Sequence, residues 1–227
     1  MRRLAAIAAM AALAGCASAP PPRTEAARFA IDAARCVGSL AEAPVHPIRR
    51  VERDGKGDDA GKPLQFGDLA ACVRASDGTP YPALVFALDG TVPLQVDLAF
   101  FIEQNVAFAA RIELLTEDYR VVRSVPFDAL ARRGYSYTGS VFLNPSDAAV
   151  RRLVLVPDAA VVGRAEESTI GVSTQTMVAV PVPAGLVYFN VSSGNEVTTR
   201  SWLSEVGSFS ISATPYQPPA ASQTPRR

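Results

Sequence analysis

The stretch Leu94-Gln95-Val96-Asp97-Leu98-Ala99-Phe100-Phe101-Ile102-Glu103 decides the fold class of this 227-residue chain. Its apolar residues alternate with mostly polar ones, so a strand through it has one apolar face and one face that is mostly wet. The stretch from Phe108 to Leu114 repeats this alternation. Two strands of this kind predict a sheet that covers an apolar core on one side only.

Other stretches complete the pattern. Leu84–Leu88 and Leu153–Val156 are apolar on both sides, which predicts strands near the middle of a sheet. Further candidate strands are Tyr119–Val122, Thr138–Leu143, Thr176–Val182, Leu186–Val191 and Phe209–Ser212, and turn signals lie at Asp89-Gly90, Glu117-Asp118, Asn144-Pro145 and Ser193-Gly194-Asn195. About nine short strands without a second crossover helix predict a mainly β chain, with one antiparallel β-sandwich domain over residues 64–214.

The segment before the sandwich predicts one short N-terminal helix. Between Glu25 and Ala41 the apolar residues recur near helical spacing, and they include Cys36. Thr24 is placed to cap this helix and Pro44 to stop it. The charged, glycine-rich residues after Pro44 predict a mobile loop, so residues 24–63 form one helix and one loop.

The first 16 residues resemble a bacterial lipoprotein signal. Two arginines precede an apolar run from Leu4 to Leu13, and Leu13-Ala14-Gly15-Cys16 forms the cleavage point. The run is too short to cross about 30 Å of hydrocarbon, which takes roughly 20 apolar residues. We expect residues 1–15 to be removed and Cys16 to carry the lipid. Alternatives are a retained helix and a cleaved signal without lipid.

The residues after Cys16 indicate the expected location. Residues 16–23, rich in alanine and proline, predict an extended spacer between the lipid and the folded domain. Ala17 differs from the aspartate of inner-membrane lipoproteins, which favours the periplasmic side of the outer membrane. At the other end, residues 215–227 are rich in Pro, Ser, Ala and Gln and predict a disordered tail.

The remaining cysteines predict a disulfide. With Cys16 assigned to the lipid, Cys36 and Cys72 are left, and two thiols in an oxidising compartment usually pair. Closing a loop of about 37 residues would contribute roughly 3–4 kcal/mol. A catalytic thiol assisted by His46, the only histidine, and a pair of reduced buried cysteines are the alternatives.

No pattern for catalysis, a metal or a cofactor stands out. The chain has no Gly-x-Ser-x-Gly motif, and its histidine and cysteines are too few for a zinc site. Carboxylates such as Asp97 and Glu113 could form a glycosidase pair, but outward strand faces ordinarily carry such groups as solvated charges. The 22 basic and 22 acidic residues are interspersed, so no stripe for nucleic acid is expected.

One cluster is a candidate for ligand binding. Arg132, Arg133, Tyr135 and Tyr137 combine guanidinium groups with flat rings, which could stack on a sugar or bind an acidic partner. The alternative is a surface loop whose tyrosines cover one end of the sandwich.

Several of these stretches together resemble the maltose-operon periplasmic protein family. The stretches are Ala83–Leu88, Leu94–Ile102, Phe108–Tyr119, Pro126-Phe127, Arg151–Pro157 and Pro183–Val191. The resemblance covers roughly Leu64 to Pro215, about two-thirds of the chain, by strand order. It implies an exported β protein associated with the uptake of maltose and maltodextrins, with no established catalytic residues. The lipid signal and the Cys36 and Cys72 pair depart from that family.

These observations predict a non-enzymatic lipoprotein, accessory to maltodextrin uptake, whose partners are the membrane and a carbohydrate or transport protein. The alternatives are a structural or assembly lipoprotein of the outer membrane without a link to sugar, and an unrecognised hydrolase. The sequence predicts no oligomeric state.

Overall fold

The computed structural model describes residues 25–51, 63–182 and 185–216, and the structural statements below concern these residues. They form two packed β-sheets and one short α-helix, α1 (Phe66–Leu69), which confirms the predicted mainly β class and the sandwich architecture. Cys16, the signal, the spacer, the centre of the predicted loop and residues 217–227 lie outside the described residues. None of the helices described could span a membrane, given their length and polarity.

The first sheet has the strand order β1-β5-β12-β8-β9, and β4 also pairs with β5. Its strands are β1 (Val45–Pro47), β4 (Ala71–Arg74), β5 (Pro80–Ala87), β8 (Ala110–Thr116), β9 (Val121–Val125) and β12 (Val150–Pro157). All pairs are antiparallel except β1 with β5. The inner strands β5 and β12 contain the two stretches predicted to be apolar on both sides.

The second sheet has the order β10-β11-β6-β7-β14-β13, and β15 pairs with β6, β2 and β3. Its strands are β2 (Arg49–Arg50), β3 (Leu64–Gln65), β6 (Leu94–Glu103), β7 (Val106–Phe108), β10 (Ala131–Arg133), β11 (Ser136–Leu143), β13 (Ala165–Val182), β14 (Gly185–Ser204) and β15 (Ser208–Pro215). The strand β6 contains the stretch that decides the fold class, and its burial alternates as predicted. It lies between β11 and β15 at the centre of the sheet.

Phenylalanine rings fill the space between the sheets. Phe86 of the first sheet meets Phe209 of the second, with ring centroids 6.2 Å apart, and Phe100 contacts Phe108 edge-on at 5.7 Å. The helix α1 adds Phe66, whose centroid lies 4.1 Å from that of Phe108. All five rings are almost fully buried. Such pairs add about 0.5–1.5 kcal/mol each beyond the burial of their area.

A second apolar cluster covers the outer face of the first sheet. Val85 of β5 and Val154 of β12 belong to it, and Val37 and Leu40 of the N-terminal segment pack on them. The N-terminal segment therefore forms a third layer on the sandwich.

The predicted helix between Glu25 and Ala41 is wrong. The segment holds two short 3₁₀ turns, Ala33–Arg35 and Leu40–Glu42; two more, Phe127–Ala129 and Pro145–Asp147, lie further along the chain. Helical spacing fails because the apolar residues face different clusters: Phe29 packs on the core between the sheets, whereas Val37 covers the outer cluster. Val37 also exchanges backbone hydrogen bonds with Cys72 and Arg74, so it lies beside β4 as a strand would.

The predicted disulfide is present. Cys36 and Cys72 are joined with their Cα atoms 4.5 Å apart, and the bond ties the third layer to β4. It encloses a long loop, because the two residues are separated by 36 positions.

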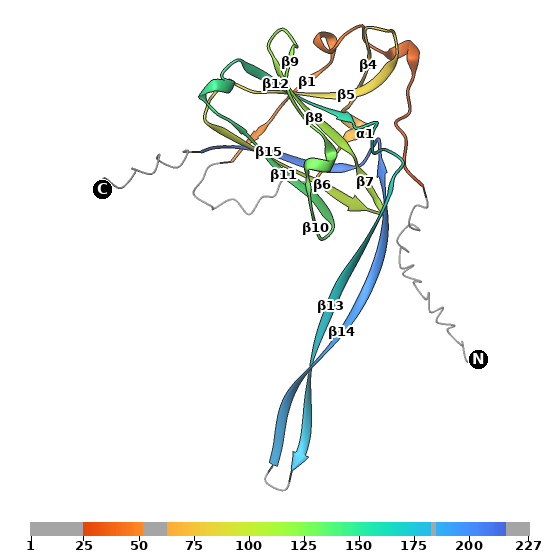
Figure 1. The fold of residues 1–227 in the computed structure, drawn as a ribbon, viewed down its shortest axis with the longest axis vertical. Coiled ribbons are helices and arrows are strands. Elements are labelled where there is room, and N and C mark those ends of the chain that lie inside the picture. Colours follow the sequence, from red (N-terminus) through yellow and green to blue (C-terminus); the bar gives the residue numbers. More distant parts are fainter. Residues whose placement is uncertain (1–24, 52–62, 183–184, 217–227) are drawn as a thin grey trace, which may run out of the picture.

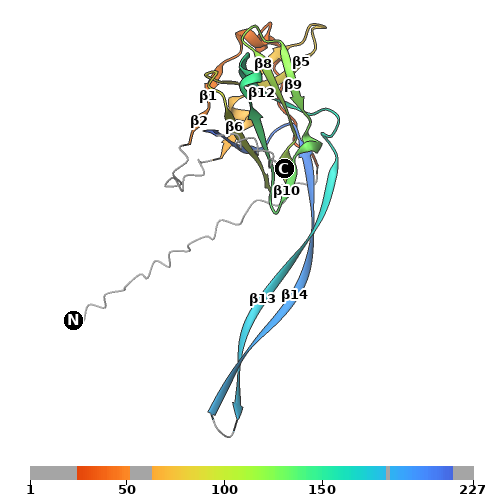
Figure 2. The same ribbon diagram turned by 60° about the vertical axis from the view of Figure 1, so that its left-hand side comes forward.

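The strands β13 and β14 continue far beyond the sandwich as a two-stranded arm (Figures 1 and 2). Their register starts at Ala165 with Trp202 and runs without a shift to Val182 with Gly185. At about 3.3 Å per residue, the paired strands span roughly 55–60 Å. The predicted turn at Ser193-Gly194-Asn195 is wrong, because β14 stays paired with β13 through all three positions.

Replacing Cys36 and Cys72 together by alanine should lower the free energy of unfolding by about 3–4 kcal/mol, because the unfolded chain regains the entropy of the enclosed loop. Urea unfolding of both proteins measures the difference. The control is reductant, which should destabilise the parent protein and leave the double variant unchanged. A loss below about 1 kcal/mol would contradict a structural role for the bond.

Candidate functional site: the arm and its base

The outer part of the arm carries no charged residue. Between Glu167 and Glu196 lie 28 residues without a single Asp, Glu, Lys or Arg. Proteins usually protect exposed strand edges with charges or with proline. The outer edge of β13 has no partner strand among the described residues, and between 168 and 182 only Pro181 is of a type that usually protects such an edge.

The register divides the arm into two unlike faces. Residues paired directly across two antiparallel strands share a face, so the even positions of β13 lie with the odd positions of β14. We call the positions 170–182 (even) and 187–197 (odd) the apolar face. Nine of its 13 positions are Ile, Val or Phe. The 12 positions opposite, 171–181 (odd) and 186–196 (even), include none of these three residue types; six are Gly, Ser, Gln or Asn, and the others are Met177, Ala179, Pro181, Leu186, Tyr188 and Glu196.

Large side chains near the tip are open to solvent. Met177 is 66% exposed, Tyr188 61% and Val178 41%, although all three lie within paired strands. Nearer the body, the hydroxyl oxygens of Thr169 and Thr198 lie 3.1 Å apart across the strands, and Thr199 donates to the carbonyl of Ser168. The arm therefore has cross-strand side-chain contacts at its base, and Met177, Val178 and Tyr188 lie open to solvent further out.

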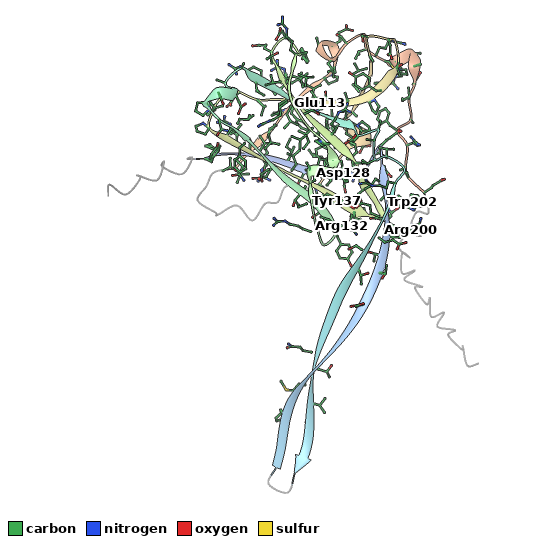
Figure 3. The ribbon with its side chains drawn as sticks, viewed as in Figure 1. Glu113, Asp128, Arg132, Tyr137, Arg200 and Trp202 are labelled. Atoms are coloured by element: carbon green, nitrogen blue, oxygen red, sulfur yellow. A yellow bond between two sulfur atoms is a disulfide. The ribbon has the colours of Figure 1, made fainter. Side chains whose placement is uncertain are left out.

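A hydrogen-bonded cluster fixes the base of the arm to the body; two of its residues, Asp128 and Tyr137, are labelled in Figure 3. The hydroxyl of Tyr137, on β11, donates to Oε2 of Glu166, on β13, at 2.6 Å. Arg164 donates to Oε1 of the same carboxylate at 2.8 Å and also pairs with Asp128. Carboxylates on two elements thus share one guanidinium group at the point where the arm leaves the sandwich.

The surroundings of this cluster shift the pKa values of three groups. Burial, followed by the hydrogen bond and charge of Glu166, raises the pKa of Tyr137 to about 12. The hydrogen bond from Arg164 lowers the pKa of the Asp128 carboxyl, and that same bond raises the pKa of the Arg164 guanidinium. The tyrosine therefore stays protonated and keeps donating at any physiological pH.

The structure separates the four residues of the predicted ligand cluster. Tyr137 is buried against Phe127, with ring centroids 4.7 Å apart, and Arg132 lies over the Tyr137 ring at 5.6 Å. Arg133 and Tyr135 are exposed in the β10–β11 hairpin. Arg132 and Tyr137 are thus close together, but they belong to the base of the arm.

A second cation lies over a ring on the arm itself. The guanidinium carbon of Arg200 is 5.0 Å from the centroid of Trp202, and both residues lie on β14 near the root of the arm (Figure 3). They share the face opposite to Glu166. Trp202 is partly buried there, outside the phenylalanine core.

A polar groove of about 490 Å³ crosses the outer face of the second sheet. Its hydroxyl groups come from β11 and β15, the two strands that flank β6, and Asp97 and Arg133 add charge; the hydroxyl residues are Thr138, Ser140, Ser210 and Ser212. Asp97 accepts hydrogen bonds from Ser140 and from Gln95, the latter at 2.8 Å. Hydroxyl and carboxylate groups on one open surface are suited to hydrogen-bonding a polyol.

Within residues 25–51, 63–182 and 185–216, no group of three or more His, Cys, Asp and Glu side chains is arranged to hold a metal ion. Comparison of the chain with protein-family models, curated proteins and solved structures finds no match. The resemblance to the maltose-operon periplasmic protein family therefore stays a prediction.

Sequence reasoning missed the arm and the groove. The two strands predicted in the outer arm, at Thr176–Val182 and Leu186–Val191, both lie within β13 and β14. The signal that could have extended them is the absence of charge from 168 to 195. The groove gives no local signal, because its residues come from strands far apart in the sequence.

Replacing Tyr137 by phenylalanine should remove one tyrosine from the highest part of the alkaline titration. The folded pKa of about 12 lies above the ordinary value of 10.0, so the stabilisation from this hydroxyl is complete below about pH 10 and is lost as the pH rises through about 12. Tyrosinate absorbance against pH measures the step.

The matched control is Tyr135→Phe, which should leave the step near pH 12 at full amplitude. Urea unfolding gives a second test: at pH 8 the Y137F protein should be about 0.5–1.5 kcal/mol less stable than the parent, because a buried hydrogen bond is lost. An unchanged titration in Y137F would show that Tyr137 does not carry the raised pKa.

Proposed function

We propose that this protein is a non-catalytic component of the bacterial cell envelope that acts in assembly, and that its arm is the binding element. The observation that carries this proposal is the ribbon of paired strands, roughly 55–60 Å long, that extends from the body and carries no charged residue from 168 to 195. A two-stranded hairpin alone is marginally stable in water. The length and apolar sequence of this hairpin therefore support the proposal that it contacts the surface of a partner.

The N-terminal segment contributes to this proposal. Ala27 donates its backbone N–H to Ser204 at the end of β14, and Arg28 pairs with Glu205. If Cys16 carries a lipid, the nine residues to Glu25 span at most about 30 Å. The tether would then hold the root of the arm near the membrane, while the arm itself is longer than the tether.

The contacts at the base of the arm support a binding element that is held in one direction. The Tyr137–Glu166 hydrogen bond is partly buried, and the Arg164 contacts join β13 to the turn that holds Asp128. An arm held at its root in this way would keep a definite direction relative to the body.

Shortening the arm tests the assembly function. Replacing residues 171–196 by Asn-Gly places a two-residue turn between Ile170 and Val197, which are directly paired, and leaves the base intact. The full chain, extracted from membranes in mild detergent, should migrate on native gels as a complex. The shortened chain should lose the complex, with its melting temperature changed by less than about 3 °C.

A body-directed control uses Val122→Ser, an exposed position on β9 far from the arm in sequence. This variant should keep the complex. Retention of the complex by the shortened chain would refute the arm as the binding element.

The polar groove favours a second candidate function, the binding of a maltodextrin by an accessory protein of sugar uptake. Its hydroxyl residues and Asp97 could hydrogen-bond sugar hydroxyls, and about 490 Å³ falls within the usual range for small-molecule sites. Arg133 is the residue of the predicted ligand cluster that lines it.

Maltotriose at millimolar concentration tests this candidate. At about 100 times its dissociation constant, a ligand stabilises by about 2.7 kcal/mol, which raises the melting temperature by roughly 5–10 °C in a chain of this size. Asp97→Ala should abolish the rise, whereas Glu117→Ala, at an exposed turn outside the groove, should preserve it. No rise in the parent protein would remove the sugar function.

A further inference from the structure

We propose that the open side of the sandwich binds a small carboxylate with an apolar body, and that Arg123 pairs with its charged group. The site is a cavity of about 260 Å³ between the two sheets, and none of its lining residues belongs to the arm. The proposal therefore goes beyond the functions proposed above. It draws on the apolar walls of the cavity, on the hydrogen bonds and charge of Arg123, and on the volume.

The cavity forms on the side where the two sheets are not joined by strand pairing. β9 is the last strand of the first sheet. In the second sheet, β10 pairs with β11 only at residues 136–138, so the outer edge of β11 from 139 to 143 has no partner strand among the described residues. The cavity is lined from β8 and β9, from this edge of β11 and from the end of the Phe127–Ala129 turn. Side chains rather than backbone hydrogen bonds close the sandwich here.

The inner walls of the cavity are apolar. Ile112 of β8 is 0% exposed and Val141 of β11 is 5% exposed, and both belong to the core between the sheets. Val125 of β9 and Leu130 pack against that core. Leu130 lies so close to β11 that a Cβ atom at Gly139 would be 2.5 Å from its Cδ2 atom. A ligand in the cavity would therefore contact the core with its apolar part, which favours binding.

Arg123 is the only charged residue among those that line the cavity. Its Nη2 atom donates to the backbone carbonyl of Phe142, on the unpaired edge of β11, at 2.9 Å. Its Nε atom is buried and has no hydrogen-bond partner. An unpaired buried donor is costly, and folded proteins rarely contain one. The guanidinium group of Arg123 thus has hydrogen-bonding capacity that the described residues do not use.

The charge of Arg123 is also unbalanced. Arg120, just before β9, pairs with Asp118 at 2.7 Å, and Arg111 of the neighbouring strand β8 pairs with Glu113 at 3.0 Å. In the part of the chain that the structure describes, Arg123 forms no such ion pair. A guanidinium group can hold a carboxylate through two parallel N–H···O bonds. A ligand with a single carboxylate would therefore supply both the missing charge and the missing acceptor.

The volume of the cavity limits the size of the ligand. A cavity of about 150 Å³ accommodates benzene, so about 260 Å³ accommodates roughly ten non-hydrogen atoms. Sites for drug-sized ligands start at about 300 Å³. The cavity is thus too small for a maltodextrin, and it fits a carboxylate whose apolar part has about seven or eight carbon atoms. Benzoate and heptanoate both meet this description, one with an aromatic and one with an aliphatic body.

Equilibrium dialysis of the full chain in mild detergent tests the proposal, with radiolabelled benzoate or heptanoate as the probe and detergent alone as the blank. At least one of the two should bind at neutral pH with a dissociation constant of about 1 mM or lower, as expected for so small a ligand. The matching amide, benzamide or heptanamide, has the same size and no charge. As an unlabelled competitor it should be at least about ten-fold weaker than the unlabelled carboxylate.

Variants of the arginine give a second measurement. Arg123→Gln removes the charge and should weaken binding by about ten-fold or more, whereas Arg123→Lys keeps the charge and should weaken it by no more than about five-fold. The matched control is Arg120→Gln, at an exposed arginine outside the cavity, which should leave the dissociation constant within about two-fold. The melting temperature of each variant shows whether it is folded, and the amide comparison on the parent protein does not depend on any variant.

Each of the following results would overturn the proposal. If neither carboxylate binds the parent protein, the cavity does not take this class of ligand. Equal competition by the amide and the carboxylate would show that Arg123 does not select a charge. Unchanged binding in a folded Arg123→Gln protein would place the carboxylate at another site. None of these measurements involves the arm or the polar groove, so the functions proposed above are tested independently.

Discussion

The unbroken register between β13 and β14 is the constraint on which the functional features of this protein depend. Successive side chains of a strand point to opposite faces, so a strand pair can exchange its faces only through a bulge or a shift. The pairing from Ala165 with Trp202 to Val182 with Gly185 contains no such shift. The face that β14 buries at Leu203 therefore continues along the arm. Val178, on the same face nearer the tip, is exposed.

The base of the arm shows which contacts hold that geometry. Ion pairs between exposed groups contribute only about 0–1 kcal/mol, so the Arg164–Asp128 pair alone would hold the root weakly. Tyr137 is different, because its ring packs on Phe127 in the core and its hydroxyl reaches Glu166 on β13. Packing on Phe127 fixes the position of the Tyr137 hydroxyl. The hydrogen bond from this hydroxyl to Glu166 then fixes the start of β13, where the arm leaves the sandwich. On the first sheet, the Cys36–Cys72 bond holds the third layer in place on β4.

The central part of the fold could be predicted from the sequence, and its periphery could not. The alternation along β6 reflects burial of one face, and the apolar runs in β5 and β12 reflect burial of both faces. Both patterns can be recognised from the order of apolar and polar residues alone. The N-terminal segment misled because Phe29 and Val37 have helical spacing but pack on different clusters. Gly194 suggested a turn, yet pairing with Ser173 keeps it within a strand. Tyr137 was expected in a ligand loop, and only the tertiary structure brings Glu166 to its hydroxyl.

The groove and the arm belong to one sheet but use different strands. Asp97 and Ser140 lie on β6 and β11, whereas the arm is built from β13 and β14. In the order of the sheet β7 stands between them, and it pairs with two residues of β6 and three of β14. Energetic coupling between two sites requires an element with two arrangements that both sites bias. A three-residue strand packed through Phe108 into the phenylalanine core has little freedom to shift. The direct connection between the groove and the arm therefore runs through β11 and not through β7, because Thr138 lines the groove and its neighbour Tyr137 donates to Glu166 at the root of the arm.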